Sequence, residues 1–158
     1  MFLHQTHLAY EQHLNARDHM LNKHPKLRYV GLHLASQEWD TDEVAFFLDE
    51  FPNTMVDLAE RICHLQYQAI SDWQKVHDFM VAYQDRIIYG TDCIDDGSLS
   101  DNELVNLMDN RYRMHWKFFT GSERMSAPKV AGQFRGLGLP FEVIEKIYNT
   151  NAARCYGI

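Results

Sequence analysis

The chain has 158 residues, of which 46% are hydrophobic and 23% charged, and its formal net charge is -7. This composition is typical of one globular domain, and the negative charge argues against non-specific binding to nucleic acid or anionic lipid. The three cysteines form no C-x-x-C pair, so neither a disulfide framework nor a cysteine zinc site is indicated. No apolar stretch approaches the roughly 20 residues that span a bilayer, and no signal-peptide pattern is present. We therefore expect a soluble, cytoplasmic protein.

The first third of the chain predicts a helix, a strand and a second helix. Residues 6–25 predict a helix that a proline ends. The apolar run over residues 26–35 is nearly continuous, which is typical of a strand buried on both faces. Asp40 and Glu43 have the spacing of a capping box. The apolar residues after them recur at helical intervals up to Phe51, which predicts an amphipathic helix.

Two further strands follow, separated by a helix. Residues 54–59 and 86–91 are short runs rich in β-branched and apolar residues, and each predicts a strand. Between them, Ser71 and Gln74 again have capping-box spacing and are followed by an apolar helical face. The order of these elements indicates a parallel sheet whose strands are adjacent in chain order.

The C-terminal part predicts two helices joined by a loop. Ser100 and Glu103 form a third capping-box pattern, at the start of a long helix that reaches about Phe119. Residues 127–140 are rich in glycine and predict a loop. Pro140 then occupies the first position of a final helix. We expect these two helices to cover the outer face of the sheet and to leave both of its edges open.

Three polar residues follow the three predicted strands: His33, Asp57 and Asp92. The carboxyl ends of parallel strands meet at one edge of a sheet, where α/β proteins place ligands and catalytic groups. Asp92 is the most informative, because it follows the apolar run in the stretch RIIYGTDC, and an unpaired carboxylate has no place inside a buried strand. We therefore expect the three side chains to converge at this edge.

Each of these residues also has a purely structural interpretation. For Asp57 we favour that interpretation, in which it caps the turn after its strand or pairs with Arg61. For His33, a core histidine that donates to a neighbouring carbonyl explains the pattern as well as a functional role does. Asp92 is also explained as a loop residue that accepts backbone N–H bonds.

Four stretches carry a resemblance to a known family. They are NKHPKLRYVGLHLAS, VDLAERICHLQYQ, YQDRIIYGTDC and the tail WKFFT…FRGLGLPFEVIEKIYNTNAARCY. In this order they resemble the C-terminal half of amidohydrolase-related proteins of the amidohydrolase 2 type. The branch is the one that includes aminocarboxymuconate semialdehyde decarboxylase. The resemblance implies an α/β fold: residues 1–158 would be strands 6–8, with their helices, of a TIM-like (β/α)8 barrel, and the N-terminal barrel half would be missing.

The resemblance also implies a site. Asp92 would be the aspartate that ends the last barrel strand, a metal ligand that helps to activate a water molecule. His33 would end the sixth strand, either as a metal ligand or as a general acid or base. A divalent metal, Zn²⁺ or alternatively Mn²⁺, lowers the pKa of its bound water and polarises a substrate carbonyl. The implied activity is that of a metal-dependent hydrolase of a small molecule, with a metal-dependent decarboxylase as the alternative.

The sequence departs from the family pattern in its length and in its metal ligands. It contains no His-x-His pair, which the family carries on its first strand, and a complete barrel needs about 250 residues. We therefore expect an incomplete ligand set and an activity that requires the missing half or a homo-oligomer. The alternative from another class is a non-catalytic module that recruits a partner through exposed strand edges. In either case we expect the isolated chain to aggregate, to dimerise or to fold only with its partner.

Overall fold

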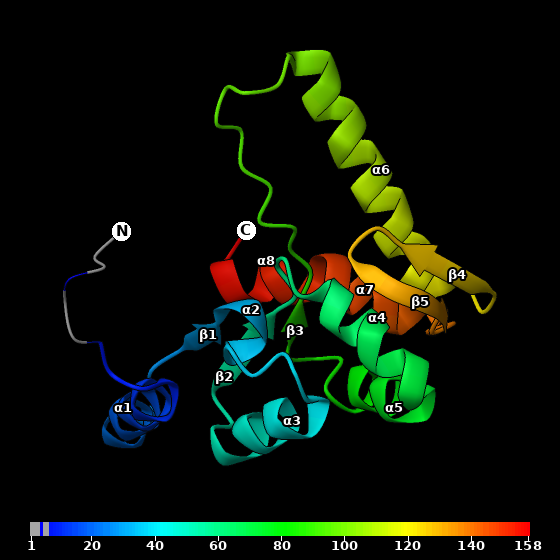
Figure 1. Ribbon diagram of the computed structural model, residues 1–158. Helices are drawn as coiled ribbons and strands as arrows, with labels where there is room; N and C mark the ends of the chain where they lie inside the picture. The colour runs from blue at the N-terminus through cyan, green and yellow to red at the C-terminus, as the bar shows by residue number, and fades with distance from the viewer. Residues whose placement is uncertain (1–3, 5–6) are drawn as a thin grey trace.

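A computed structural model describes residue 4 and residues 7–158, which form a mixed α/β structure (Figure 1). The elements in chain order are α1 (Tyr10–Lys23), β1 (Tyr29–Gly31), α2 (Leu32–Ala35), α3 (Thr41–Glu50), β2 (Thr54–Asp57), α4 (Ile62–Ser71), α5 (Trp73–Ala82), β3 (Ile87–Ile88), α6 (Asp101–Thr120), β4 (Arg124–Ala127), β5 (Val130–Arg135), α7 (Phe141–Glu145), the π-helix η1 (Lys146–Thr150) and α8 (Asn151–Tyr156).

The central sheet consists of three parallel strands in the order β1-β2-β3. β1 pairs with β2 from Tyr29↔Thr54 to Gly31↔Val56, and β2 pairs with β3 through Val56↔Ile87. The predicted parallel sheet with strands adjacent in chain order is confirmed. Because all three strands run in the same direction, their carboxyl ends meet at one edge.

The hydrophobic core lies between this sheet and helices α3, α4 and α5. Val56 and Ile87 of the sheet are fully buried, as are Leu48, Leu65 and Met80, one from each of the three helices. Within α3, Val44, Phe47 and Leu48 are buried at helical intervals, as the amphipathic pattern of the sequence predicted. Among the helices of residues 4 and 7–158, none is long and apolar enough to cross a membrane.

Two of the three helix caps predicted from capping-box spacing lie at the predicted residue. Asp40 caps α3 by accepting a backbone N–H bond. Ser100 and Glu103 form the reciprocal capping box at the start of α6. The prediction for α5 was wrong by one residue: Asp72, rather than Ser71, accepts the bond at its start. The sequence analysis also missed α4, which ends immediately before this cap.

The first strand is shorter than predicted. The apolar run over residues 26–35 continues through β1, but the strand ends at Gly31. Residues 33–36 all have φ between 55° and 60°, so the segment labelled α2 is a left-handed turn. The turn folds back closely on Gly31, where an added Cβ would lie 2.7 Å from the Cβ of Ala35. Only glycine fits at that point of close approach.

The predicted loop over residues 127–140 was also wrong in part, because β4 and β5 form an antiparallel hairpin there. The strands pair Met125 with Phe134, and both side chains are buried. β5 packs against α4, so the hairpin extends the core away from the main sheet.

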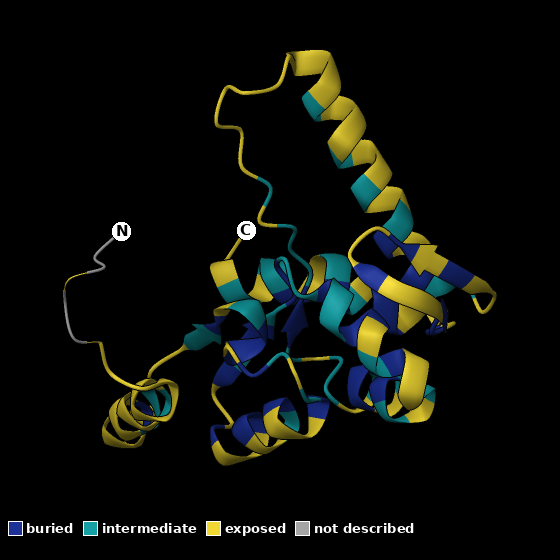
Figure 2. Ribbon diagram, in the orientation of Figure 1, coloured by how far each residue is buried: buried dark blue, intermediate teal, exposed yellow. Residues whose placement is uncertain are grey.

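Helix α6 extends away from the body of the protein, next to the segment of residues 89–100 that leads into it (Figure 1). Its first turns are exposed, whereas the body around the sheet is largely buried (Figure 2). Val105 is 63% exposed, but Phe118 and Phe119 at the other end of the helix are fully buried. The C-terminal end of α6 is therefore the part that anchors it to the core.

The two edges of the sheet differ, which corrects the expectation that both are open. At β3 the backbone N–H of Tyr89 donates to the carbonyl oxygen of Ile147 at 2.8 Å. The Asn151 side chain donates to the carbonyl of Ile87 at 2.8 Å. The π-helix η1 and α8 thus cover the β3 edge. Within the described residues, β1 pairs with β2 alone.

Candidate functional site

Backbone strain concentrates at the carboxyl edge of the sheet. In residues 4 and 7–158, six residues other than glycine have left-handed φ values, and each follows one of the three parallel strands. Residues 33–36 follow β1, Glu60 follows β2 and Asp92 follows β3. This conformation costs an L-residue about 1–2 kcal/mol. Such strain persists where surrounding contacts impose it, and it clusters at functional sites.

His33 and Asp57 are brought together at this edge. The backbone N–H of His33 donates to Oδ1 of Asp57 at 2.6 Å. The same Oδ1 accepts from the backbone N–H of Ala59 at 3.3 Å. The His33 ring closes the arrangement, because its Nδ1 lies 2.8 Å from the carbonyl oxygen of Ala59. Asp57 therefore holds the backbone on both sides of the imidazole.

These contacts settle two of the structural interpretations. Asp57 does cap the turn after its strand, whereas Arg61 pairs with Glu38, with its Nε 2.8 Å from Oε1. His33 does face a neighbouring carbonyl. A carbonyl oxygen only accepts, so Nδ1 carries the hydrogen, and Nε2 of the neutral ring is left as an acceptor. The half-buried His33 is thus oriented like a histidine whose second nitrogen is available to a ligand.

The left-handed turn is held from outside by α1. Nη1 of Arg17 donates to the carbonyl oxygen of Ala35 at 2.7 Å, and the Tyr10 hydroxyl donates to that of Ser36. The Arg17 side chain is only 11% exposed and lies over the ring of Phe47. Burial, with the charge of a nearby glutamate, raises the pKa of Tyr10 to about 12. These tertiary contacts stabilise the strained turn.

Asp92 lies at the same edge but touches neither of the other two residues. Its side chain is exposed, and it forms no hydrogen bond or ion pair with His33 or Asp57. It also does not accept the backbone bonds that the structural interpretation required. Asp95 and Asp96 accept those bonds instead, in the loop that follows. Strands that are two apart in a sheet lie about 10 Å from each other, so a separation of that size between the backbones of His33 and Asp92 stays a prediction.

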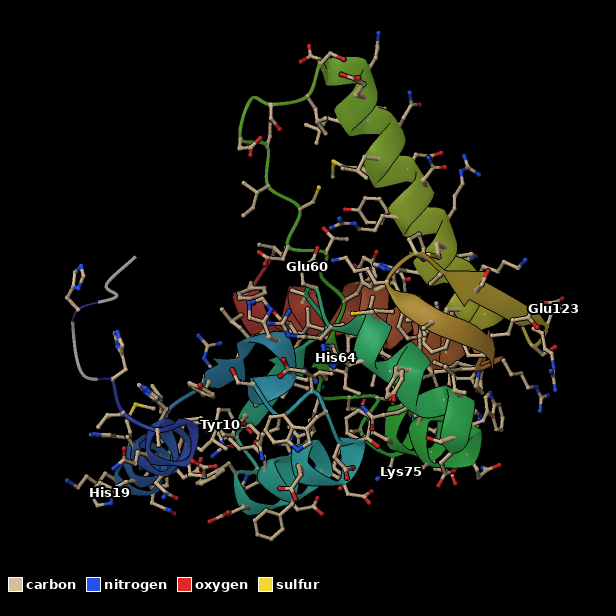
Figure 3. The ribbon with its side chains drawn as sticks, in the orientation of Figure 1. Tyr10, His19, Glu60, His64, Lys75 and Glu123 are labelled. Atoms are coloured by element: carbon tan, nitrogen blue, oxygen red, sulfur yellow. The ribbon has the colours of Figure 1, made fainter. Side chains whose placement is uncertain are left out.

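The sequence analysis missed a charged group beside this edge. Oε1 of Glu60 lies 2.6 Å from Nη1 of Arg111, and its other oxygen pairs with Lys129. Nη1 of Arg111 also donates to the carbonyl of Thr91 at 3.2 Å, so it joins the ends of β2 and β3. Figure 3 shows Glu60 at the start of α4, close to the base of the segment that leads to α6. The partners lie 51 and 69 residues apart from Glu60, and no local pattern signals such a contact.

The described residues do not by themselves form a metal centre. Over residues 4 and 7–158, no group of three or more histidine, cysteine, aspartate or glutamate residues is arranged to hold an ion. At the carboxyl edge the donors available are Nε2 of His33 and the carboxylate of Asp92. Catalytic zinc usually takes three ligands from the protein. The described residues therefore supply fewer ligands than a catalytic zinc site usually has.

A model of the amidohydrolase family matches residues 4–158, which is nearly the whole chain. The chain belongs to the amidohydrolase family. Membership indicates a hydrolase-type function and agrees with the mixed α/β fold and with polar residues at the carboxyl ends of parallel strands. No curated protein and no solved structure matches this amidohydrolase in the corresponding comparisons.

Proposed function

We propose that this chain contributes strands 6–8 of a (β/α)8 barrel to a metal-dependent hydrolase, in which His33 and Asp92 belong to the active site. Zn²⁺ is the first candidate for the metal and Mn²⁺ the second. The remaining metal ligands come from the part of the barrel that these residues do not include. The family match supports a hydrolase, and the three parallel strands agree with a segment of a barrel.

The observation that carries this proposal is the position of the strained residues. All six left-handed residues of the described chain other than glycine follow the sheet's carboxyl ends, and they include both His33 and Asp92. A protein that used this edge only to turn the chain would be more stable with glycine at these positions. Non-glycine side chains at such positions indicate that the side chains themselves are needed.

We infer a different role for each of the three residues. Nε2 of His33 is the acceptor of a fixed imidazole, so it serves as a ligand or takes a proton from an attacking water. Oδ1 of Asp57 accepts hydrogen bonds from two backbone N–H groups, and Asp57 therefore positions His33. Asp92 presents an exposed carboxylate that is free to accept a proton or to bind a cation. When bound, a divalent metal supplies Lewis acidity and an activated water.

The experiment completes the barrel with a second chain. Residues 1–158 are co-expressed with a chain that carries the first five barrel strands of a family member, including its His-x-His pair. The complex is purified and its metal content is measured together with the hydrolysis of a panel of esters, lactones and amides. We expect His33→Asn and Asp92→Asn each to lower kcat/KM at least about a hundredfold. The matched control is Asp96→Asn, which changes an acid of the same loop and should alter kcat/KM less than about threefold.

Two results would contradict this proposal. One is a complex that binds no more metal than residues 1–158 alone, which would favour the interaction module. The other is hydrolysis that survives both substitutions. The decarboxylase alternative is separated by the products: a carboxy-lyase releases CO₂ from an aromatic or enoic acid without consuming water, so assays for CO₂ accompany the hydrolysis panel.

A further inference from the structure

A cavity of about 290 Å³ lies between α4, α6 and the β4–β5 hairpin. Apolar side chains from these elements form most of its wall: Ile62, Leu107, Met114, Ala127 and Pro128. The polar residues that line it include Glu60, Gln66, Arg111 and Lys129. Apolar walls with a small number of fixed polar groups are typical of small-molecule sites, and this volume lies at the lower end of their range.

The polar groups at one end of the cavity leave a positive charge in excess. Glu60 pairs with both Arg111 and Lys129, so one carboxylate faces two cations. Burial acts to raise the pKa of Glu60, but the hydrogen bond from Lys129 and the charge of Arg111 outweigh it and lower that pKa. His115, which also lines the cavity, adds no charge near neutral pH, because burial lowers its pKa to about 4. This end therefore attracts a single negative charge.

Gln66 provides a second polar group further along the cavity. Its side chain is 1% exposed, and its Nε2 has no hydrogen-bond partner in the described part of the chain. An unpaired buried donor of this kind costs about 1–3 kcal/mol. Ile62, the first residue of α4, lies two positions after Glu60. Gln66 is four residues further along the helix, which is a rise of about 6 Å. A ligand that placed an oxygen there would satisfy the amide.

We propose that this cavity binds a small monocarboxylate whose apolar body carries a second oxygen acceptor at its far end. The carboxylate lies at Arg111 and Lys129, the body packs on the apolar wall, and the far oxygen accepts from Nε2 of Gln66. An aromatic ring with the carboxylate and the oxygen in para positions is a body of this kind. None of His33, Asp57 and Asp92 lines the cavity, but Glu60 and Thr91 do, so the site lies beside the proposed active site without requiring its chemistry.

The test uses three probes that differ by one group each. Para-hydroxybenzoate has the carboxylate, the ring and the far oxygen. Benzoate lacks the far oxygen, and para-hydroxybenzamide lacks the charge. Titration calorimetry on residues 1–158 should give the tightest binding for para-hydroxybenzoate. Saturable binding that does not distinguish the three probes overturns the proposal, and so does no binding of any of them.

Variants assign each end of the ligand to its residue. Gln66→Leu replaces the unpaired amide with an apolar group, so the fold is retained. It should weaken para-hydroxybenzoate about tenfold and leave benzoate unchanged. Lys129→Met should weaken both carboxylates but not the amide. Arg113→Met is the control for the loss of a cation, because Arg113 lies on α6, is 76% exposed and pairs with Asp109 outside the cavity.

A chemical readout locates the bound probe. Cys63 lines the cavity, whereas Cys93 and Cys155 do not, so the two others are replaced by serine. Para-hydroxybenzoate should slow alkylation of Cys63 in this background, and Gln66→Leu should remove most of that protection at the same probe concentration. Binding that leaves the alkylation rate of Cys63 unchanged would place the probe elsewhere and refute the assignment.

Discussion

The backbone nitrogen of His33 donates a hydrogen bond to Oδ1 of Asp57 at 2.6 Å, which ties the turn after β1 to the end of β2. Through Ala59, the same pair also fixes the imidazole, because Ala59 donates to Asp57 and accepts from the His33 ring. One carboxylate thus controls both the backbone and the side chain of the candidate catalytic histidine. Asp57 is a positioning residue by this geometry, and its substitution should affect stability as well as orientation.

Replacing Asp57 with alanine should lower the free energy of unfolding by about 2 kcal/mol, because two backbone N–H groups lose their acceptor. Amide exchange at His33 and Ala59 should become faster. Urea unfolding and hydrogen exchange followed by NMR measure the two effects. Asp57→Asn keeps an oxygen at the same position and should recover most of the stability. An alanine variant as stable as the wild type would mean that the two hydrogen bonds contribute nothing.

The left-handed turn leads to a second prediction: glycine should stabilise the protein at a position in the turn and destabilise it at a position in a helix. Ser36 is exposed and has φ 60°, a conformation that glycine adopts without strain. Ser36→Gly should therefore raise the free energy of unfolding by about 0.5–1 kcal/mol, even after the greater flexibility of glycine in the unfolded chain. The control is Ala45→Gly in the middle of α3, which should lower it by about 1 kcal/mol. Urea unfolding that shows a loss at both positions would contradict the strain.

Local patterns in the sequence predicted the elements that depend on local forces. At the starts of α3 and α6, the side chains of Asp40 and Glu103 accept from backbone N–H groups within three residues. The parallel sheet follows from the alternation of strands and helices. The three residues at its carboxyl edge, His33, Asp57 and Asp92, were found for the same reason.

What the sequence could not show depends on distant contacts. The run GLHLA alternates apolar residues like a strand, and contacts with Asp57, Arg17 and Tyr10, all distant in sequence, hold it in a left-handed turn. The hairpin of β4 and β5 was hidden because its glycines indicate a loop until the pairing of Met125 with Phe134 is known. The cover of the β3 edge by Asn151 connects residues 64 positions apart. Contacts between residues so far apart produce no periodic pattern in the sequence.

His115 makes stability depend on pH in a defined window. Burial, together with the positive charges of Arg111 and Lys129, lowers the pKa of His115 to about 4 in the folded protein, while Glu60 acts in the opposite direction. The unfolded chain has the ordinary value of 6.5. The unfolded state therefore binds the proton first as the pH falls. The contribution is fully present above pH 6.5 and is lost progressively down to about pH 4, on the order of 3 kcal/mol.

The measurement compares urea unfolding of the wild type and His115→Asn at several pH values. Asparagine keeps a polar group that can bond the Tyr89 hydroxyl, which lies 3.1 Å from Nδ1 of His115. The difference in free energy between the two proteins should change by up to about 3 kcal/mol between pH 6.5 and pH 4 and stay constant above that range. His19→Asn, at an exposed position in α1, is the control and should follow the wild type. A difference that does not vary with pH would show that His115 does not titrate in this window.

The last prediction concerns self-association, and the two sheet edges decide where it occurs. The β3 edge is covered by η1 and α8, whereas β1 pairs with no described strand except β2, and Leu32 at its end is 57% exposed. An open edge with exposed apolar residues is a template for pairing with another chain. We expect the chain to form dimers or larger species through β1 as its concentration rises.

Val30→Lys places a charge in the middle of this edge and should shift the protein to the monomer. Val105→Lys is the control, because Val105 is exposed on α6, far along the chain from the edge. Sedimentation velocity measures the mass of each. If Val105→Lys dissociates the protein and Val30→Lys does not, the apolar face of α6 is the contact, and the β1 edge is not.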